Sequence, residues 1–200
     1  MLPFKLGITG SIGMGKTQTA KFFFQEGVPV WDADKTVHKL YKKGEDGYNA
    51  IKKFSNIYVN TYEVDRKKIL EESLKQKDLL SKIESKIHPL LKKDRNEFIY
   101  KNKYHPIIIF DIPLLFETSE REWLDGVLVV KTNPIEQERR VLKRGTMTKD
   151  QFQKINSKQI NIEEKCQLAD FIIETDLGLR HVKTEVKKII QTILKKNVKN

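Results

Sequence analysis

The chain has 200 residues, of which 38% are hydrophobic and 32% are charged, and its formal net charge is +11. This length and composition predict one compact core with an inserted subdomain and exclude a disordered chain. The longest apolar stretch, "PIIIFDIPLLF", is too short to cross a bilayer and contains Asp111, so the pattern excludes a transmembrane helix there.

The positive charge comes mainly from lysine, since only seven of the 38 basic residues are arginine. Lysines spread over every helical segment are typical of a solvated surface, and no nucleic-acid-binding motif accompanies them. We therefore expect neither nucleic acid nor a membrane as a partner. Cys166 is the only cysteine, which excludes an intramolecular disulfide and a cysteine metal cluster. The first residues lead straight into a predicted strand without a signal-peptide pattern, so we expect a cytoplasmic protein.

Five short runs rich in Ile, Val and Leu predict buried strands. The runs are Phe4–Thr9, Val28–Asp32, Pro106–Asp111, Gly126–Lys131 and Asp170–Glu174. Continuous apolar runs are typical of a parallel sheet that is covered on both faces. Helical patterns separate the runs, so the sequence predicts an α/β fold with an open, five-stranded parallel sheet and helices on both faces.

Two helices and two insertions complete this prediction. Helical spacing of apolar residues predicts a first helix over Lys16–Gln25 and a last helix over Arg180–Lys196. About seventy residues separate the second and third strands, which is more than a crossover helix needs, and they predict a helical subdomain over 35–104. The polar segment 144–165 is typical of a lid. The predicted core is then 1–34, 105–143 and 166–200.

The stretch "GSIGMGKT" after the first strand carries the phosphate-loop (P-loop) pattern G-x-x-x-x-G-K-[ST], with Gly10, Gly15, Lys16 and Thr17 at its fixed positions. Glycines let the backbone amides point at phosphate oxygens, and the start of the next helix adds partial positive charge. Lys16 would reach the β- and γ-phosphates, and the Thr17 hydroxyl would bind Mg²⁺. GTPases, motor ATPases and small-molecule kinases share this loop, so other residues must define the reaction.

Acidic residues follow two of the predicted strands. Asp32 and Asp34 follow the second strand and would lie at the edge of the sheet where ligands bind. One of them could accept a hydroxyl proton and the other could serve the metal, but a helix cap is the structural alternative. Asp111 closes the third strand, as a Walker B aspartate that supports Mg²⁺ does, and its alternative is a turn residue.

Two further features have functional and structural interpretations. Arg140 and Arg144 lie four residues apart on one helix face that leads into the predicted lid. They could neutralise charge on a transferred phosphoryl group, or form a solvated basic face. His88 precedes Pro89 within a helical pattern, where a lone histidine is more often structural than catalytic.

In this order and spacing, the motifs resemble those of the dephospho-coenzyme A kinases. The similarity covers nearly the whole chain, from "GITGSIGMGKT" through "DAD", "HPL", "DIPLLFE" and "QERRVLKR" to "ADFIIET". The resemblance implies a P-loop NTPase fold with a helical CoA-binding subdomain and a lid. It also implies transfer of the γ-phosphoryl group of ATP, with Mg²⁺, to the ribose 3′-hydroxyl of dephospho-CoA, the last step of CoA biosynthesis. The sequence does not give the oligomeric state, and we favour a monomer.

The resemblance also implies roles for individual residues. Asp34, Lys16 and Arg140 match catalytic positions, with Asp34 as the base for the ribose hydroxyl. The ATP-binding positions are matched by Gly10, Gly13, Met14, Gly15, Lys16, Thr17, Gln18 and Arg144. The acceptor-side positions are matched by Thr9, Asp32, Asp34, His88, Leu114 and Leu115. Thr17 stands where serine is usual and keeps the hydroxyl for Mg²⁺, whereas the metal role of Asp111 is expected from its Walker B position, where some members have an apolar residue. Thr175 stands where asparagine is frequent, near the adenine side.

Two alternatives remain open from the residues alone. A nucleoside or nucleoside-monophosphate kinase on the same scaffold would phosphorylate thymidylate or cytidylate in preference to dephospho-CoA. A regulatory NTPase that binds nucleic acid would use the +11 charge and would show salt-sensitive affinity for DNA or RNA.

Overall fold

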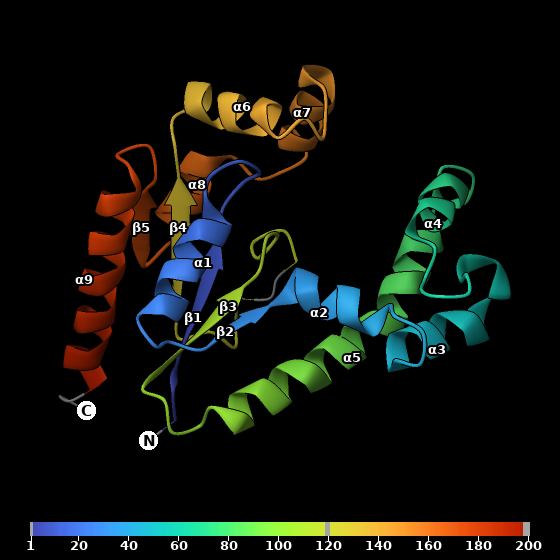
Figure 1. Cartoon of the computed structure of the whole chain (residues 1–200), viewed down its shortest axis with the longest axis horizontal. Coiled ribbons are helices and arrows are strands. Elements are labelled where there is room, and N and C mark those ends of the chain that lie inside the picture. Colours follow the sequence, from blue (N-terminus) through green and yellow to red (C-terminus); the bar gives the residue numbers. More distant parts are fainter. Residues whose placement is uncertain (1, 119–120, 198–200) are drawn as a thin grey trace. The chain divides into compact units, whose positions relative to one another are not determined.

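The computed structural model describes residues 2–118 and 121–197. The chain forms two compact units, which can be followed by their colours in Figure 1. The first unit consists of Met1–Trp31 together with Asn102–Asn200, and the second is Asp32–Lys101.

A five-stranded sheet organises the first unit, with the strand order β2-β3-β1-β4-β5. The strands are β1 (Phe4–Thr9), β2 (Val30–Asp32), β3 (Ile107–Asp111), β4 (Gly126–Lys131) and β5 (Phe171–Glu174). β1 pairs in parallel with both β3 and β4, and β4 pairs in parallel with β5. The predicted α/β fold with a parallel sheet is confirmed, and β1 lies at its centre.

Three strands begin slightly later than the apolar pattern predicts. Pro29 and Pro106 precede β2 and β3, because proline has no backbone N–H to donate to a neighbouring strand. Asp170 precedes β5; its amide donates to the Val127 carbonyl oxygen at 2.9 Å, and its side-chain carboxylate accepts from the Val127 amide at 2.8 Å. Each of these residues therefore borders its strand.

Five helices complete the described part of the first unit. They are α1 (Lys16–Gln25), α6 (Pro134–Lys143), α7 (Lys149–Asn156), α8 (Ile162–Gln167) and α9 (Leu179–Asn197). α1 and α9 pack against each other on one face of the sheet (Figure 1). α6 and α7 contact each other beyond the end of β4, and α8 packs against β4.

The core between the sheet and the helices α1 and α9 is apolar. α9 places Val182, Val186, Ile189 and Ile193 in it, as the predicted stripe requires. From the first strand, Leu6 and Ile8 are fully buried. This packing fixes the start of α1 at the carboxyl end of β1, which positions the loop between them.

The second unit is helical. Its elements are α2 (Ala33–Leu40), α3 (Asp46–Phe54), a short 3₁₀ turn (Asn56–Tyr58), α4 (Arg66–Ser73) and α5 (Leu79–Lys101). It has an apolar cluster of its own, which includes Leu40, Ile51, Leu79, Ile83 and Ile87. Because this cluster is separate from the core of the first unit, the second unit has its own packing.

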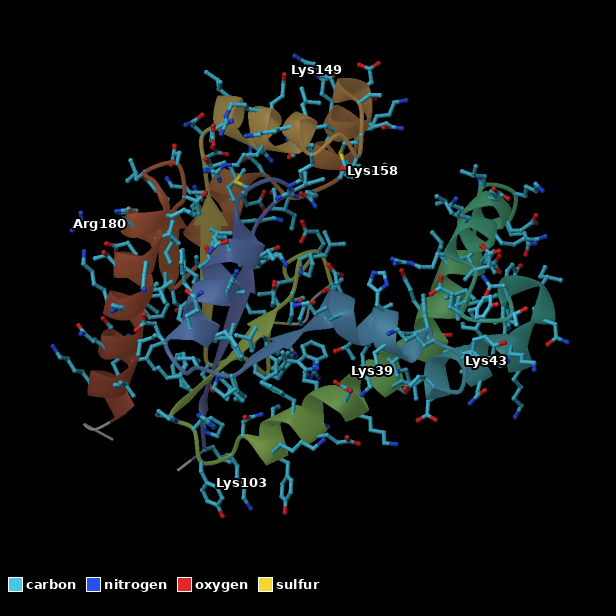
Figure 2. The ribbon with its side chains drawn as sticks, viewed as in Figure 1. Lys39, Lys43, Lys103, Lys149, Lys158 and Arg180 are labelled. Carbon is cyan, nitrogen blue, oxygen red and sulfur yellow. The ribbon has the colours of Figure 1, made fainter. Side chains whose placement is uncertain are left out.

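The surface of each unit carries dispersed positive charge. In the first unit, Lys103, Lys149, Lys158 and Arg180 lie on different segments (Figure 2). Among the residues that the structure describes, no helix combines the length and the apolar character needed to span a bilayer.

Two adjacent phenylalanines of α1 allow a matched test of the core. Phe23 is fully buried, whereas Phe24 is 67% exposed. We expect Phe23→Ala to lower the free energy of unfolding by about 3–5 kcal/mol, because it leaves a cavity between the sheet and α9. Phe24→Ala should change it by less than about 0.5 kcal/mol. Urea denaturation followed by circular dichroism measures both, and equal effects would contradict the packing described here.

Candidate active site

The P-loop joins the end of β1 to the start of α1. Gly13 and Gly15 adopt positive φ angles of 81° and 95°, a region that residues with a side chain rarely occupy. A Cβ atom on Gly13 would lie 2.6 Å from Val141, and one on Gly15 would lie 3.1 Å from the Thr175 hydroxyl oxygen. These two glycines therefore allow the loop both its turn and its close packing.

The start of α1 is available to an anion. In the part of the chain that the structure describes, no side chain caps this helix, and its first turn contains no acidic residue. Helix amides at an uncapped amino terminus favour phosphate groups. Of the residues predicted to bind ATP here, Lys16, Thr17 and Gln18 lie in this first turn, and the loop before it carries Gly10, Gly13, Met14 and Gly15.

Lys16 and Asp111 form an ion pair beneath the P-loop. The ammonium group of Lys16 donates a hydrogen bond to the carboxylate of Asp111. The Lys16 side chain is 16% exposed and that of Asp111 is 5% exposed, so solvent screens the pair weakly. Asp111 reaches this place because β3 runs parallel to β1 and pairs it with Ile8. The predicted strand-end aspartate is thus beside the P-loop lysine.

The residues predicted to bind the metal, Thr17 and Asp111, belong to the same part of the site. The Thr17 side chain is exposed at the start of α1. Its hydroxyl and the carboxylate of Asp111 are oxygen ligands, the kind that Mg²⁺ prefers. No group of three or more His, Cys, Asp or Glu residues that could hold a metal occurs within 2–118 and 121–197. The ligand chemistry therefore fits Mg²⁺ held by a few side chains together with substrate phosphates.

Arg140 is held by a network that reaches the P-loop. Its Nε donates to Glu136 at 2.7 Å, and its two terminal nitrogens donate to the hydroxyl and carbonyl oxygens of Thr175 at 2.8 Å each. The Thr175 hydroxyl in turn donates to the carbonyl oxygen of Met14 at 2.8 Å. This network connects α6, the end of β5 and the P-loop.

Glu136 stays ionised throughout the physiological pH range. Hydrogen bonds from Arg139 and then Arg140 lower the pKa of Glu136 to about 2. The i, i+4 spacing of Glu136 and Arg140 on α6 is the sequence signal for this contact. Because the carboxylate does not take up a proton near neutral pH, its hydrogen bond to Arg140 is kept there.

Cys166 carries the single thiol of the chain. Burial raises the pKa of this thiol and so disfavours its thiolate form.

The segment after β3 lies beside the start of the P-loop. The Thr9 hydroxyl donates to the carbonyl oxygen of Pro113 at 3.0 Å. The Leu114 side chain is 42% exposed, as a residue that contacts a ligand should be, but Leu115 is fully buried. In this structure Leu115 supports the segment from the core, because its side chain has no surface to offer a substrate.

Three predicted acceptor-side residues belong to the second unit. Asp32 caps α2, since its carboxylate accepts from the Lys35 amide at 2.9 Å, which is the structural alternative. Asp34 is exposed in the first turn of α2. His88 is exposed on α5, which continues through Pro89. The part that these residues take in the site of the first unit stays a prediction.

Two amide side chains that sequence reasoning missed also hold the P-loop. Gln137 on α6 donates to the carbonyl oxygen of Ile12 at 2.7 Å and to the Asn156 side chain at 3.1 Å. The amide of Ile12 donates to Gln159 at 3.3 Å. Beside them lies a cavity of about 550 Å³ with a mostly polar lining, which includes Ser11, Met14, Thr132, Gln137, Asn156 and Gln159. Arg144, the remaining residue predicted to bind ATP, lies at the end of α6 and is exposed.

The Thr175 hydroxyl provides a specific test of this network. Thr175→Val keeps the shape of the side chain but removes the hydroxyl that accepts from one terminal nitrogen of Arg140 and donates to the Met14 carbonyl oxygen. We expect the affinity for ATP to fall about tenfold, the value of one or two buried hydrogen bonds. Calorimetry with a non-hydrolysable ATP analogue measures the change. Thr184→Val is the control, because that exposed hydroxyl bonds only within α9, and equal losses in the two variants would contradict the assigned role.

Several known proteins are similar to this chain in sequence or in structure. The family model described as "Dephospho-CoA kinase" matches residues 4–181. The dephospho-CoA kinase of Ruegeria pomeroyi is 41% identical over 197 residues, which cover 98% of this chain and 99% of that protein.

Two solved structures are similar over nearly the full length. The dephospho-CoA kinase from Campylobacter jejuni has a TM-score of 0.65 and 26% identity, and covers 96% of this chain and 98% of its own. The protein TT1252 from Thermus thermophilus has a TM-score of 0.84 at 24% identity over the same shares of the two chains, and so shares the fold. The family match and the sequence identities over nearly the whole length mean that this chain belongs to the dephospho-CoA kinase family, whose members phosphorylate dephospho-CoA to CoA.

Proposed function

We propose that this chain transfers the γ-phosphoryl group of ATP to the ribose 3′-hydroxyl of dephospho-CoA and releases CoA and ADP. The observation that carries the proposal is the complete P-loop at the centre of the sheet, in a chain that belongs to the dephospho-CoA kinase family. ATP is the phosphate donor that this family uses. The proposed site has a donor side, which binds ATP, and an acceptor side, which binds dephospho-CoA.

On the donor side, the protein neutralises and orients phosphate. Backbone amides of the P-loop and the start of α1 receive the phosphate oxygens, and Lys16 turns from Asp111 toward the β- and γ-phosphates. Arg140, already oriented by Glu136 and Thr175, supplies charge to the transferred group. Positioning of this kind contributes most of the catalysis when the transition state is loose.

On the acceptor side, the proton of the ribose hydroxyl must leave as the new O–P bond forms. Asp34 is the proposed acceptor of that proton, because its carboxylate is exposed and is not the one that caps α2. Asp32 supports it by fixing the start of α2. We propose that the exposed residues His88 and Leu114 contact the substrate. Thr9 and Leu115 are both fully buried and would support Leu114 from the core of the first unit.

Mg²⁺ would be held by the Thr17 hydroxyl and by Asp111, with phosphate oxygens completing its coordination. When bound, it supplies charge that neutralises the β- and γ-phosphates. Removal of Lys16 takes the ion-pair partner from the buried Asp111 carboxylate, so loss of activity in such a variant needs a check of its folding.

The residues 144–165, which form α7 and most of α8, are the proposed lid. Exclusion of water by a lid prevents hydrolysis of ATP without transfer to the acceptor. We further propose that the protein acts as a monomer in the cytoplasm, with small-molecule substrates only.

A panel of acceptors tests the reaction directly. With ATP and Mg²⁺, we expect ADP release to be fastest with dephospho-CoA and at least about a hundredfold slower with thymidylate or cytidylate, because these lack the pantetheine arm. A coupled ADP-release assay measures the rates in one series. Faster turnover with a nucleoside monophosphate would instead indicate a nucleotide kinase, and stimulation of hydrolysis by DNA or RNA would indicate a nucleic-acid-dependent NTPase.

Removal of the Asp34 carboxylate tests the proposed base. Asp34→Asn should lower kcat by about 10²–10⁴-fold, because the amide cannot accept the hydroxyl proton, and should leave ATP affinity within about threefold. Steady-state kinetics and calorimetry with ATP measure the two effects. Asp46→Asn, another acid in the first turn of a helix in the same unit, is the control. A wild-type kcat in Asp34→Asn would rule out Asp34 as the base.

A further inference from the structure

A fully buried lysine in α8 has no part in the reaction proposed above. The Lys165 side chain is 0% exposed, although lysine is almost never buried without a partner. Its Nζ lies 2.7 Å from Oε1 of Glu117, which belongs to the segment that follows β3. The Glu117 side chain is 17% exposed, so the two charges form an ion pair that is largely removed from water.

This pair is costly to build. Within the described residues, neither Lys165 Nζ nor Glu117 Oε2 has a hydrogen-bond partner, so the 2.7 Å contact is an ion pair without the geometry of a hydrogen bond. Desolvation of two charges offsets much of their attraction, and an apolar pair of similar size is often as stable. Stability alone therefore does not explain why these two side chains are charged.

The same carboxylate reaches the polypeptide that leads to α8. Glu117 Oε1 accepts a hydrogen bond of 3.1 Å from the backbone amide of Ile160. The preceding residue, Gln159, accepts from the amide of Ile12 in the P-loop. Two consecutive residues thus connect the segment after β3 to the P-loop.

The other end of this connection is held as well. Asn156, at the end of α7, accepts from Gln137, which also donates to the carbonyl oxygen of Ile12. Residues 156–160 are therefore attached to the P-loop through the amide and the carbonyl of Ile12 and to the segment after β3 through Glu117. That segment carries Leu114, placed above on the acceptor side, and it follows Asp111.

We infer that Glu117 and Lys165 are positioning residues for phosphoryl transfer, which hold residues 156–160 so that the P-loop and the segment after β3 keep a fixed relative geometry. The inference rests on the proposed function. Because transfer requires donor and acceptor to be aligned closely, a small shift between these two segments lowers kcat more than it lowers the affinity for ATP. The attachment of residues 156–160 also limits any lid movement to the residues before them, 144–155.

A double variant separates this positioning role from a contribution to stability. Glu117→Leu with Lys165→Met removes both charges and the acceptor of the Ile160 amide, and replaces them with apolar side chains of similar size. We expect the melting temperature to stay within about 5 °C of the wild type, because no buried charge is left unpaired. We expect kcat to fall by about ten- to a hundredfold, with KM for ATP within about threefold.

Amide hydrogen exchange gives a second readout that does not need turnover. In the double variant, the amides of Ile12 and Ile160 should exchange faster, while the amides of β1 keep their protection. The single variant Lys165→Arg should keep the wild-type kcat and protection, because it retains the charge beside Glu117. Glu185→Leu with Lys188→Met, a pair on the exposed side of α9 with 2.7 Å between its charged atoms, is the matched control and should change neither quantity.

Two results would overturn the inference: a kcat within about threefold of the wild type in the stable double variant, or unchanged exchange at Ile12 and Ile160. If the double variant does not fold, Glu117→Gln is used, which keeps an oxygen for the Ile160 amide; a wild-type kcat in that variant contradicts a role for the charge. A wild-type chain inactive on dephospho-CoA would refute the proposed function, whereas the exchange experiment would still test the connection.

Discussion

The backbone of the P-loop needs left-handed turns in places where no side chain can fit, and this constraint shapes the rest of the first unit. Gly13 packs against Val141 of α6, and Gly15 packs against Thr175 at the end of β5. Because both approaches need the absence of a Cβ, α6 and the end of β5 can lie directly on the loop. The same closeness brings Arg140 within reach of Thr175. The tight turn and the placement of the arginine are thus one structural requirement.

Much of the first unit could be predicted because its signals are local. The bounds of β1, β4 and α1 follow from apolar runs and from the glycines at their borders. The position of Asp111 next to Lys16 follows from the order of parallel strands. Gln137 and Gln159 could not be predicted in this way. They bond to the backbone of Ile12, 125 and 147 residues away in the chain, and such contacts leave no periodicity in the sequence.

The second unit shows where one residue supports two interpretations. Asp32 could be predicted as a helix cap or as a functional carboxylate, and its bond to the Lys35 amide identifies it as a cap. A cap fixes the start of α2 and therefore the direction in which Asp34 leaves the helix, so a structural residue determines the geometry of the proposed base. Proline at position 89 predicts a weak point in α5. The helix continues through it, and apolar packing holds both sides: Ile83 and Ile87 are buried before the proline, and Leu90 and Leu91 pack against the same cluster after it.

The buried pair of Glu117 and Lys165 has a consequence for how the family can diverge. A single substitution that removes one charge leaves the other buried without its ion-pair partner, which is more harmful than the loss of both. Evolution at these two positions should therefore proceed in pairs, or by exchange of lysine for arginine. Relatives that lack an acid at the position of Glu117 should also lack a base at that of Lys165. Sequence covariation between the segment after β3 and α8 would then record a physical contact, as it does for other paired buried charges.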